Sequence, residues 1–330
     1  MRLLIICGIA ALLVSCSRPA PLSPELTTPK LALEAIRPEL RERPLFSTSD
    51  QELTPFPQAW RALDRKERFG SVLLAGDPAR FRPLLDHLRR AHDFTLTRVD
   101  PTSYFFERNP TKTEVWTTAS IPSVLEAYPA KEQQLARVQL AHRLIYLDEL
   151  PAAKALLDEV LKQTPESPEA WTQMAAWHGS AGQWSAALHA ANRALAAKRN
   201  YRPAQVAKAQ ALEAQGQFDD ALILTRALYA ATPDDPQILF LYAKVAHSAH
   251  AYQEEILVMK SLIALLQKHA QPVGNWQIFL GQAHSAVGET RQAAEQFQAA
   301  LKDPSLGEAQ RAFATKALER FGVNTSAISN

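Results

Sequence analysis

Small side chains recur at a fixed spacing through residues 134–305. Alanine returns every 34 residues at two places, and each period holds two apolar runs at helical spacing, joined by a short turn. Pro165 and Pro233 stand where the second run of a period ends, because proline blocks the continuation of a helix. The pattern predicts pairs of helices that pack closely at their small residues. The recurring positions are Ala141, Ala175, Ala209 and Ala243 in the first run, and Ala153, Ala187 and Ala221 in the second.

This period and the residues that carry it resemble the tetratricopeptide repeat (TPR), a helix–turn–helix unit. Successive repeats begin near residues 134, 168, 202 and 236. The resemblance implies a mainly α fold, in which about five helix hairpins over residues 134–305 form a TPR α-solenoid. A capping helix over 306–321 covers the last repeat, and a tail over 322–330 follows. A small α/β module precedes the array.

The fourth repeat departs from the family pattern. His250 stands where other repeats have the turn glycine, and Glu255 replaces the small residue of the second helix. This second helix is predicted to be longer, so the fifth repeat starts four residues late and restores the pattern between Gly281 and Gly288. His247 and His250 form an HxxH spacing at a helix end, where solvation or capping explains them better than a metal site.

The TPR resemblance also implies a partner-binding groove along the first helix of each repeat. The Lys/Asn set that holds C-terminal carboxylates in chaperone-binding TPRs is absent, so we expect an extended or helical segment of an envelope protein as ligand. The residues predicted to line the groove are Val138, His142, Thr172, Ala176, Val206, Gln210, Phe240, Lys244, His247, Ile278 and Gln282.

The N-terminus reads as a signal peptide over residues 1–15. Arg2 is followed by twelve apolar residues, Leu3 to Val14, a run too short for an ordinary membrane-spanning helix. The run ends Leu-Val-Ser-Cys16 and resembles the lipobox of bacterial lipoproteins. The resemblance implies cleavage before Cys16, lipidation of its thiol and acyl chains such as palmitate at the new N-terminus. Ser17 implies outer-membrane sorting with the body facing the periplasm; the alternative is an ordinary secretory signal.

Charge and cysteine content argue against nucleic-acid binding and against cysteine chemistry. The chain has 36 basic and 34 acidic residues, and removing Arg2 with the signal leaves 35 against 34. This balance gives no reason to expect binding to nucleic acid. The two cysteines are Cys7, lost with the signal, and Cys16, so a disulfide and thiol catalysis are excluded. We expect no metal and no cofactor.

Two further segments precede the repeats. Residues 16–57 are rich in proline, which predicts an extended tether. Residues 58–128 predict a small βαββ module: an apolar strand at 71–75, a helix that starts at Asp77–Pro78, and a hairpin of strands at 94–99 and 104–108. The part from 72 to 108 resembles, without a sharp motif, the soluble C-terminal module of some membrane glycosyltransferases. This resemblance suggests an envelope-polysaccharide setting, but it does not extend to transferase activity.

No catalytic constellation emerges from the sequence. The GxSxG, SxxK, phosphate-loop and HExxH motifs are all missing. The leading hypothesis is a non-enzymatic, membrane-anchored TPR scaffold that binds protein partners in a periplasmic envelope assembly. The alternative is an accessory lipoprotein for surface-polysaccharide synthesis or export, with the module binding sugar or enzyme. A third hypothesis, an enzyme housed in the module, has no motif in its favour.

Overall fold

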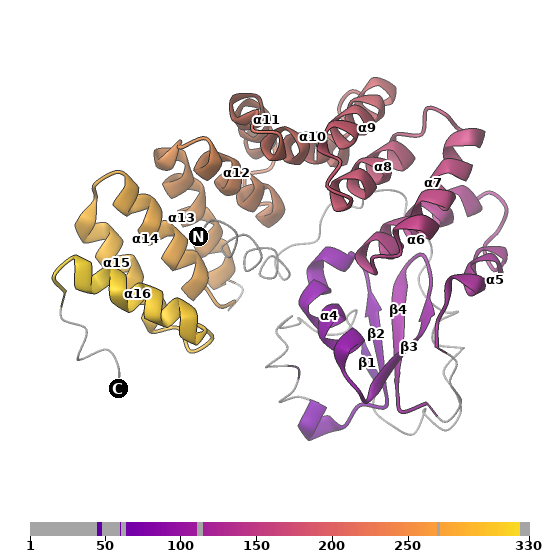
Figure 1. Cartoon of the computed structure of the whole chain (residues 1–330), viewed down its shortest axis with the longest axis horizontal. Helices are drawn as coiled ribbons and strands as arrows, with labels where there is room; N and C mark the ends of the chain where they lie inside the picture. The colour runs from indigo at the N-terminus through magenta and orange to yellow at the C-terminus, as the bar shows by residue number, and fades with distance from the viewer. Residues whose placement is uncertain (1–44, 48–59, 61–63, 111–114, 269–270, 324–330) are drawn as a thin grey trace. The chain divides into compact units, whose positions relative to one another are not determined.

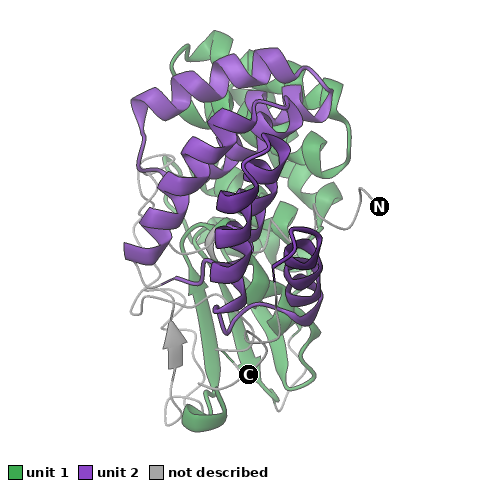
Figure 2. Ribbon diagram, turned by 90° about the vertical axis from the view of Figure 1, so that its left-hand side faces the viewer, with its two compact units in different colours: residues 1–15, 19–207 green, residues 16–18, 208–330 purple. Residues whose placement is uncertain are grey.

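The computed structural model describes residues 45–47, 60, 64–110, 115–268 and 271–323, which fall into two compact units. The described part of unit 1 runs to Ala207, and unit 2 begins at Lys208, within helix α10 (Arg202–Ala214) (Figure 2). The predicted signal peptide, the lipidation site Cys16 and most of the predicted tether lie outside the described residues.

A four-stranded sheet forms the module of unit 1 (Figure 1). The β3–β4 hairpin and the antiparallel β2–β4 pair confirm the predicted strand order. One strand corrects the sequence analysis: Leu45–Ser47 pairs in parallel with β2, although it falls in the segment assigned to the tether. Three residues after a proline are too few to show the alternation that marks a strand. The sheet order is β1 (Leu45–Ser47), β2 (Ser71–Ala75), β4 (Ser103–Arg108), β3 (Phe94–Val99).

The helix of the module begins at Asp77 as predicted. The Asp77 carboxylate accepts a hydrogen bond from the Ala79 amide at 3.0 Å, and Pro78 supplies a backbone angle suited to the first turn. That turn is a 3-10 helix, η2 (Pro78–Phe81), which continues into α4 (Arg82–Arg90). The buried face of α4 belongs to the same core as one face of the sheet. This core includes Leu84, Leu85 and Leu88 of α4 and Val72, Leu74, Tyr104 and Phe106 of the strands.

Five helix hairpins follow in the described chain, as predicted from the period. A short connection not predicted from the sequence, η3 (Thr118–Ser120) and α5 (Ile121–Glu126), leads into them. The fourth hairpin has the predicted longer second helix, of 17 residues. The hairpins pair α6 (Gln133–Tyr146) with α7 (Leu150–Gln163), α8 (Pro168–Ser180) with α9 (Trp184–Ala197), α10 with α11 (Phe218–Ala231), α12 (Pro236–Ser248) with α13 (Tyr252–Lys268), and α14 (Gly274–Ala286) with α15 (Thr290–Leu301).

The turn of every hairpin holds one residue with a positive φ. The angles are 63° at Asp148, 71° at Gly182, 77° at Gly216, 56° at His250 and 81° at Gly288. Glycine adopts this conformation without a clash from a Cβ atom, whereas aspartate and histidine adopt it at a cost. The repeat pattern therefore holds in backbone geometry even where the glycine is replaced.

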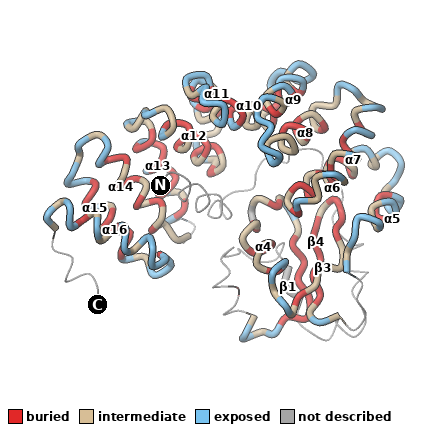
Figure 3. The backbone as a smooth tube through the Cα atoms, viewed as in Figure 1, coloured by how far each residue is buried: buried red, intermediate tan, exposed pale blue. Residues whose placement is uncertain are grey.

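One hydrophobic core joins the module to the first two repeats within unit 1. It continues from the sheet and α4 through Val124 of α5 and Leu140 of α6 to Ala190 of α9. Figure 3 colours the residues of β4 mostly as buried, and buried residues such as Leu140 and Leu144 continue this core in α6. In unit 2, α16 (Glu308–Arg320) buries Leu318 beside Phe297 of α15 and closes the array, as the predicted capping helix should.

Candidate functional site

Three residues of the predicted groove contribute to the packing of the repeats. Val138, Thr172 and Ile278 each keep only 6% of their surface exposed. The Thr172 hydroxyl donates a hydrogen bond to the carbonyl oxygen of Pro168 at 2.7 Å, within its own helix. These side chains offer little surface to a partner, because they fill the space between helices.

The first repeat also uses its predicted groove for contacts inside the molecule. His142 Nδ1 lies 2.8 Å from the Gln173 side-chain oxygen of the next repeat. Its Nε2 lies 3.7 Å from a carboxylate oxygen of Asp77, at the start of the module helix. Ala176 packs against the core of unit 1, and Val206 is half-buried. The module therefore occupies part of the surface that the first repeat was predicted to offer.

A buried arginine fastens the module to α6. The Arg143 Nε donates to the carbonyl of Pro101 at 2.9 Å, and Nη2 donates to the carbonyl of Gly76 at 2.7 Å. The Tyr104 hydroxyl donates to the Arg143 carbonyl at 2.9 Å, and the guanidinium lies 5.1 Å from the centre of the Tyr104 ring. Burial lowers the pKa of Arg143 and raises the pKa of Tyr104. Arg143 therefore has a structural role, because its Nε and Nη2 donate to carbonyl oxygens of the protein itself.

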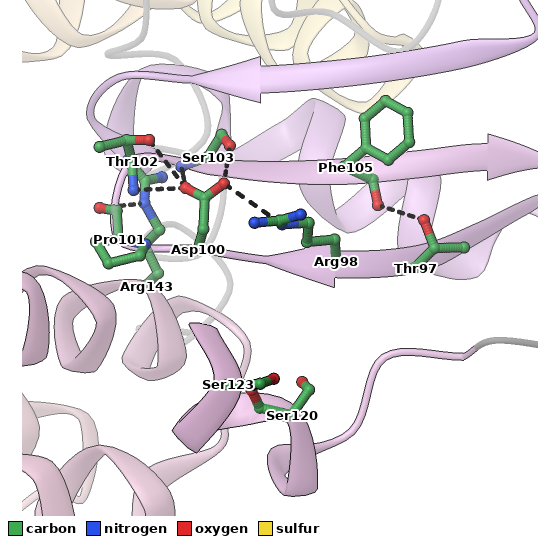
Figure 4. A network of polar contacts seen from close by, with 10 residues as sticks. All are labelled: Thr97, Arg98, Asp100, Pro101, Thr102, Ser103, Phe105, Ser120, Ser123 and Arg143. Atoms are coloured by element: carbon green, nitrogen blue, oxygen red, sulfur yellow. Dashed lines mark hydrogen bonds and ion pairs between the residues drawn. The ribbon is translucent and has the colours of Figure 1, made fainter. Parts of the chain in front are cut away.

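The β3–β4 turn holds the Pro101 carbonyl in position for Arg143. Asp100, 3% exposed, accepts hydrogen bonds from both the amides and the hydroxyls of Thr102 and Ser103, at 2.8–2.9 Å (Figure 4). Arg98 lies 4.0 Å from the same carboxylate. These contacts fix the turn and aim the Pro101 carbonyl at Arg143. The Asp100 carboxylate is thus fully used by its own turn, which supports the junction with Arg143.

In unit 2, one face of α12 carries three of the predicted groove residues. We call Phe240, Lys244 and His247 the α12 stripe, because spacings of four and three place them on one side of a helix. The Phe240 ring meets Trp276 of α14 edge to face, with ring centres 5.7 Å apart. Lys244 Nζ lies 2.8 Å from a carboxylate oxygen of Glu213. The remaining predicted residues of this unit, Gln210 and Gln282, are exposed and half-exposed.

His247 is held by a buried carboxylate. Its Nδ1 lies 3.1 Å from both side-chain oxygens of Glu255, which is 2% exposed. Other repeats have alanine at this position, for example Ala221, so a charged group here is a specific departure from the pattern. The hydrogen bond to Glu255 raises the pKa of His247 above its ordinary value. His250 does not join this pair; its Nδ1 lies 2.8 Å from the Tyr252 hydroxyl.

Three residues that contact the stripe or its partners were not predicted from the sequence: Glu213, Ser248 and Trp276. Glu213 accepts from both Lys244 and the Ser248 hydroxyl, the latter at 3.0 Å, and Trp276 supports Phe240. Glu213 had a usable signal: it precedes His247 by one period of 34 residues and so occupies the same place in its repeat. Trp276 had no such signal, because the fifth repeat is shifted by four residues and the 34-residue period does not extend to it.

The module carries a pocket of its own. It has a volume of about 480 Å³ and lies beside the ion pairs that Arg108 makes with Asp64 and Asp93. The Arg108 guanidinium lies 4.3 Å from the centre of the Phe94 ring, which stiffens this wall. The lining residues are Trp60, Asp64, Arg65, His87, Ala91, Asp93 and Phe94.

The described residues hold neither a candidate metal site nor a candidate membrane span. No three or more His, Cys, Asp and Glu side chains of these residues gather as ligands for a metal ion. Among the same residues, every helix is too short or too polar to cross a membrane.

The comparisons with known proteins agree with this architecture. Residues 202–245 match the model of the tetratricopeptide repeat. The helical hairpins are TPRs. Among solved structures, PilW, described as a widely conserved type IV pilus biogenesis factor, superposes with a TM-score of 0.51 at 19% identity, covering 59% of this chain and 88% of PilW.

Two further solved structures have lower scores. MamA from Desulfovibrio magneticus RS-1 gives a TM-score of 0.46 at 20% identity over 51% of this chain and 93% of its own. YrrB, described as a TPR protein with an unusual peptide-binding site, gives 0.47 at 16% identity over 61% and 100%. No protein with a curated description matches the sequence. At these identities the likeness concerns the fold of the TPR array.

Proposed function

We propose that this protein is a non-enzymatic, membrane-anchored TPR adaptor that binds protein partners in a periplasmic envelope assembly. The observation that carries the proposal is the α12 stripe, which presents an aromatic ring, a lysine and a histidine on one side of a helix. Such a mixed surface suits a protein segment with an apolar anchor and polar neighbours. The membrane anchor rests on the lipobox-like sequence that ends at Cys16.

Crosslinking in the native host tests the adaptor function. A photoreactive residue at Gln282, which is half-exposed on α14, should capture envelope proteins. The same capture should fall several-fold when Phe240 is replaced by alanine, because truncation removes the aromatic anchor. PilW is a pilus biogenesis factor by its own description, so appendage components are the first partners to seek. Recovery of no envelope protein above background would count heavily against the proposal.

The anchor has a separate test. Replacing Cys16 by serine removes the thiol that lipidation requires, so the variant should leave the detergent-rich phase of a Triton X-114 separation and enter the aqueous phase. Several acyl chains are needed for firm anchoring, and a variant without them should be released. Unchanged partition of the Cys16→Ser protein would show that the membrane association has another origin.

A second candidate is an accessory role in surface-polysaccharide synthesis or export. The pocket in the module favours this role. The paired carboxylates and cations at the pocket suit a neutral, hydroxyl-rich ligand. Deleting the module is a poor test, because the shared core of unit 1 would be exposed. Replacing His87 by alanine keeps that core and alters the pocket wall; unchanged surface polysaccharide in this strain would remove the candidate.

A further inference from the structure

The charges around the α12 stripe lie in two layers. The Lys244 side chain is 36% exposed, whereas its partner Glu213 is 11% exposed. The His247 side chain is 59% exposed, whereas its partner Glu255 is 2% exposed. In both pairs the carboxylate lies inside and the cation lies outside. A partner that approaches this face therefore meets the basic side chains first, and His247 adds a positive charge there when its ring is protonated.

The orientation of His247 adds a directed donor to that outer layer. Its Nδ1 is occupied by Glu255, so the other ring nitrogen, Nε2, faces away from the buried carboxylate. The groups in contact with the ring are Glu255 of α13 and Tyr252 at the start of α13, and His250 in the turn contacts Tyr252. Of these, only Glu255 is an acid. Protonated His247 can thus donate outward while Glu255 balances its charge from behind.

The stripe has dimensions that suit a short peptide motif. Residues on a helix rise about 1.5 Å each, so Phe240 and His247 are about 10 Å apart along α12. An extended peptide covers this distance in about three residues. The half-buried Phe240 ring, backed by Trp276, offers an apolar contact at one end, and the two cations occupy the rest.

We propose that the α12 stripe binds an acidic partner segment, in which an apolar side chain packs on Phe240 and neighbouring carboxylates accept hydrogen bonds from Lys244 and from Nε2–H of protonated His247. This inference rests on the proposed adaptor function and names the chemistry of its partner. Binding strengthens when His247 is protonated and weakens when it is neutral. Glu255 sets the pH at which this change occurs, because it stabilises the protonated ring.

Fluorescence anisotropy with designed peptides tests the proposal on the whole chain. The probes are labelled, end-blocked, histidine-free 15-residue peptides that repeat Leu-Glu-Glu, Leu-Gln-Gln or Leu-Lys-Lys. At pH 6 the Leu-Glu-Glu peptide should bind at least tenfold more tightly than the Leu-Gln-Gln peptide, and its affinity should fall at least threefold by pH 8.5. His247→Gln should abolish this pH dependence, and Glu255→Gln should move its midpoint to lower pH.

The controls separate the inference from the adaptor function. Lys208→Ala, a half-exposed cation outside the stripe, should leave binding unchanged, and circular dichroism should confirm that every variant is folded. Equal binding of the acidic and amide peptides, or absence of binding by all three, would overturn the inference. Capture of envelope proteins through Gln282 in the native host would then still support the adaptor. Self-association that depends on pH and is lost in His247→Gln would make a second copy the occupant and would also overturn it.

Discussion

The turns of the first and fourth hairpins place side chains where glycine is favoured. His250 has φ 56°, and a non-glycine residue in this region costs roughly 1–2 kcal/mol. A glycine at this position would lose more conformational entropy on folding, which costs roughly 0.5–1 kcal/mol of stability. We therefore expect His250→Gly to stabilise unit 2 by about 0.5–1 kcal/mol, measured as an increased midpoint in urea. The reverse change, Gly216→Ala at φ 77°, should lower the midpoint; no change in either variant would contradict the argument.

The His247–Glu255 pair predicts how stability depends on pH. The hydrogen bond to Glu255 raises the pKa of His247 in the folded protein above the value near 6.5 expected when the chain is unfolded. A raised histidine pKa contributes stability that is fully present below about pH 6.5 and is lost as pH rises through the folded-state pKa. The urea midpoints of the native protein and His247→Gln should thus differ most at pH 5.5 and converge by pH 8.5. A constant difference would contradict the ion pair.

At the scale of elements, α14 and α15 approach so closely that glycine is required between them. A Cβ atom on Gly281 would lie 2.9 Å from Cε1 and 3.0 Å from Cζ of Phe297. That ring is 2% exposed and packs beside Phe313 and Phe321, so it has little room to move. Gly281→Ala should cost about 1–3 kcal/mol in the free energy of unfolding.

A double-mutant cycle checks this contact. Phe297→Leu makes space at the cost of lost packing, so the double variant should be more stable than the sum of the two single changes predicts. Gln282→Ala, on the same helix and half-exposed, serves as the control and should change stability by no more than about 0.5 kcal/mol. Strict additivity of the two core changes would show that the clash is relieved elsewhere.

The helices could be predicted from the sequence because small residues and turn positions recur with one period. The longer α13 and the shifted fifth repeat followed from the same internal spacing. Strand β1 could not be predicted, because its three residues show no alternation and it pairs with a strand 26 residues further along the chain. The periodic groove positions located the α12 stripe. They could not show that Ile278 is buried or that Glu213 holds Lys244, since these depend on packing between repeats.

At the scale of the whole molecule, the module and the first repeats cannot be treated as independent domains. The pattern of predicted elements placed a boundary near residue 128, but unit 1 continues to Ala207, and apolar side chains from both parts form one core. The module also supplies the N-terminal cover that an array of repeats needs, and α16 supplies the cover at the other end, in unit 2. The stability of β4 and of α6 should therefore be coupled.

Arg143 offers the sharpest test of that coupling. Arg143→Met keeps the length of the side chain but leaves the buried carbonyl of Pro101 without its donor, and it also removes the donor to the more exposed carbonyl of Gly76. An unsatisfied buried carbonyl costs about 1–3 kcal/mol, whereas water can reach the Gly76 carbonyl, so the change should destabilise unit 1 by about 1–3 kcal/mol. Hydrogen exchange should then quicken together in peptides from β4 and from α6, because the two share a core. Arg291→Ala, from an exposed pair on α15, should leave both unchanged. Faster exchange in α6 alone, with β4 still protected, would show that the module folds independently of the repeats.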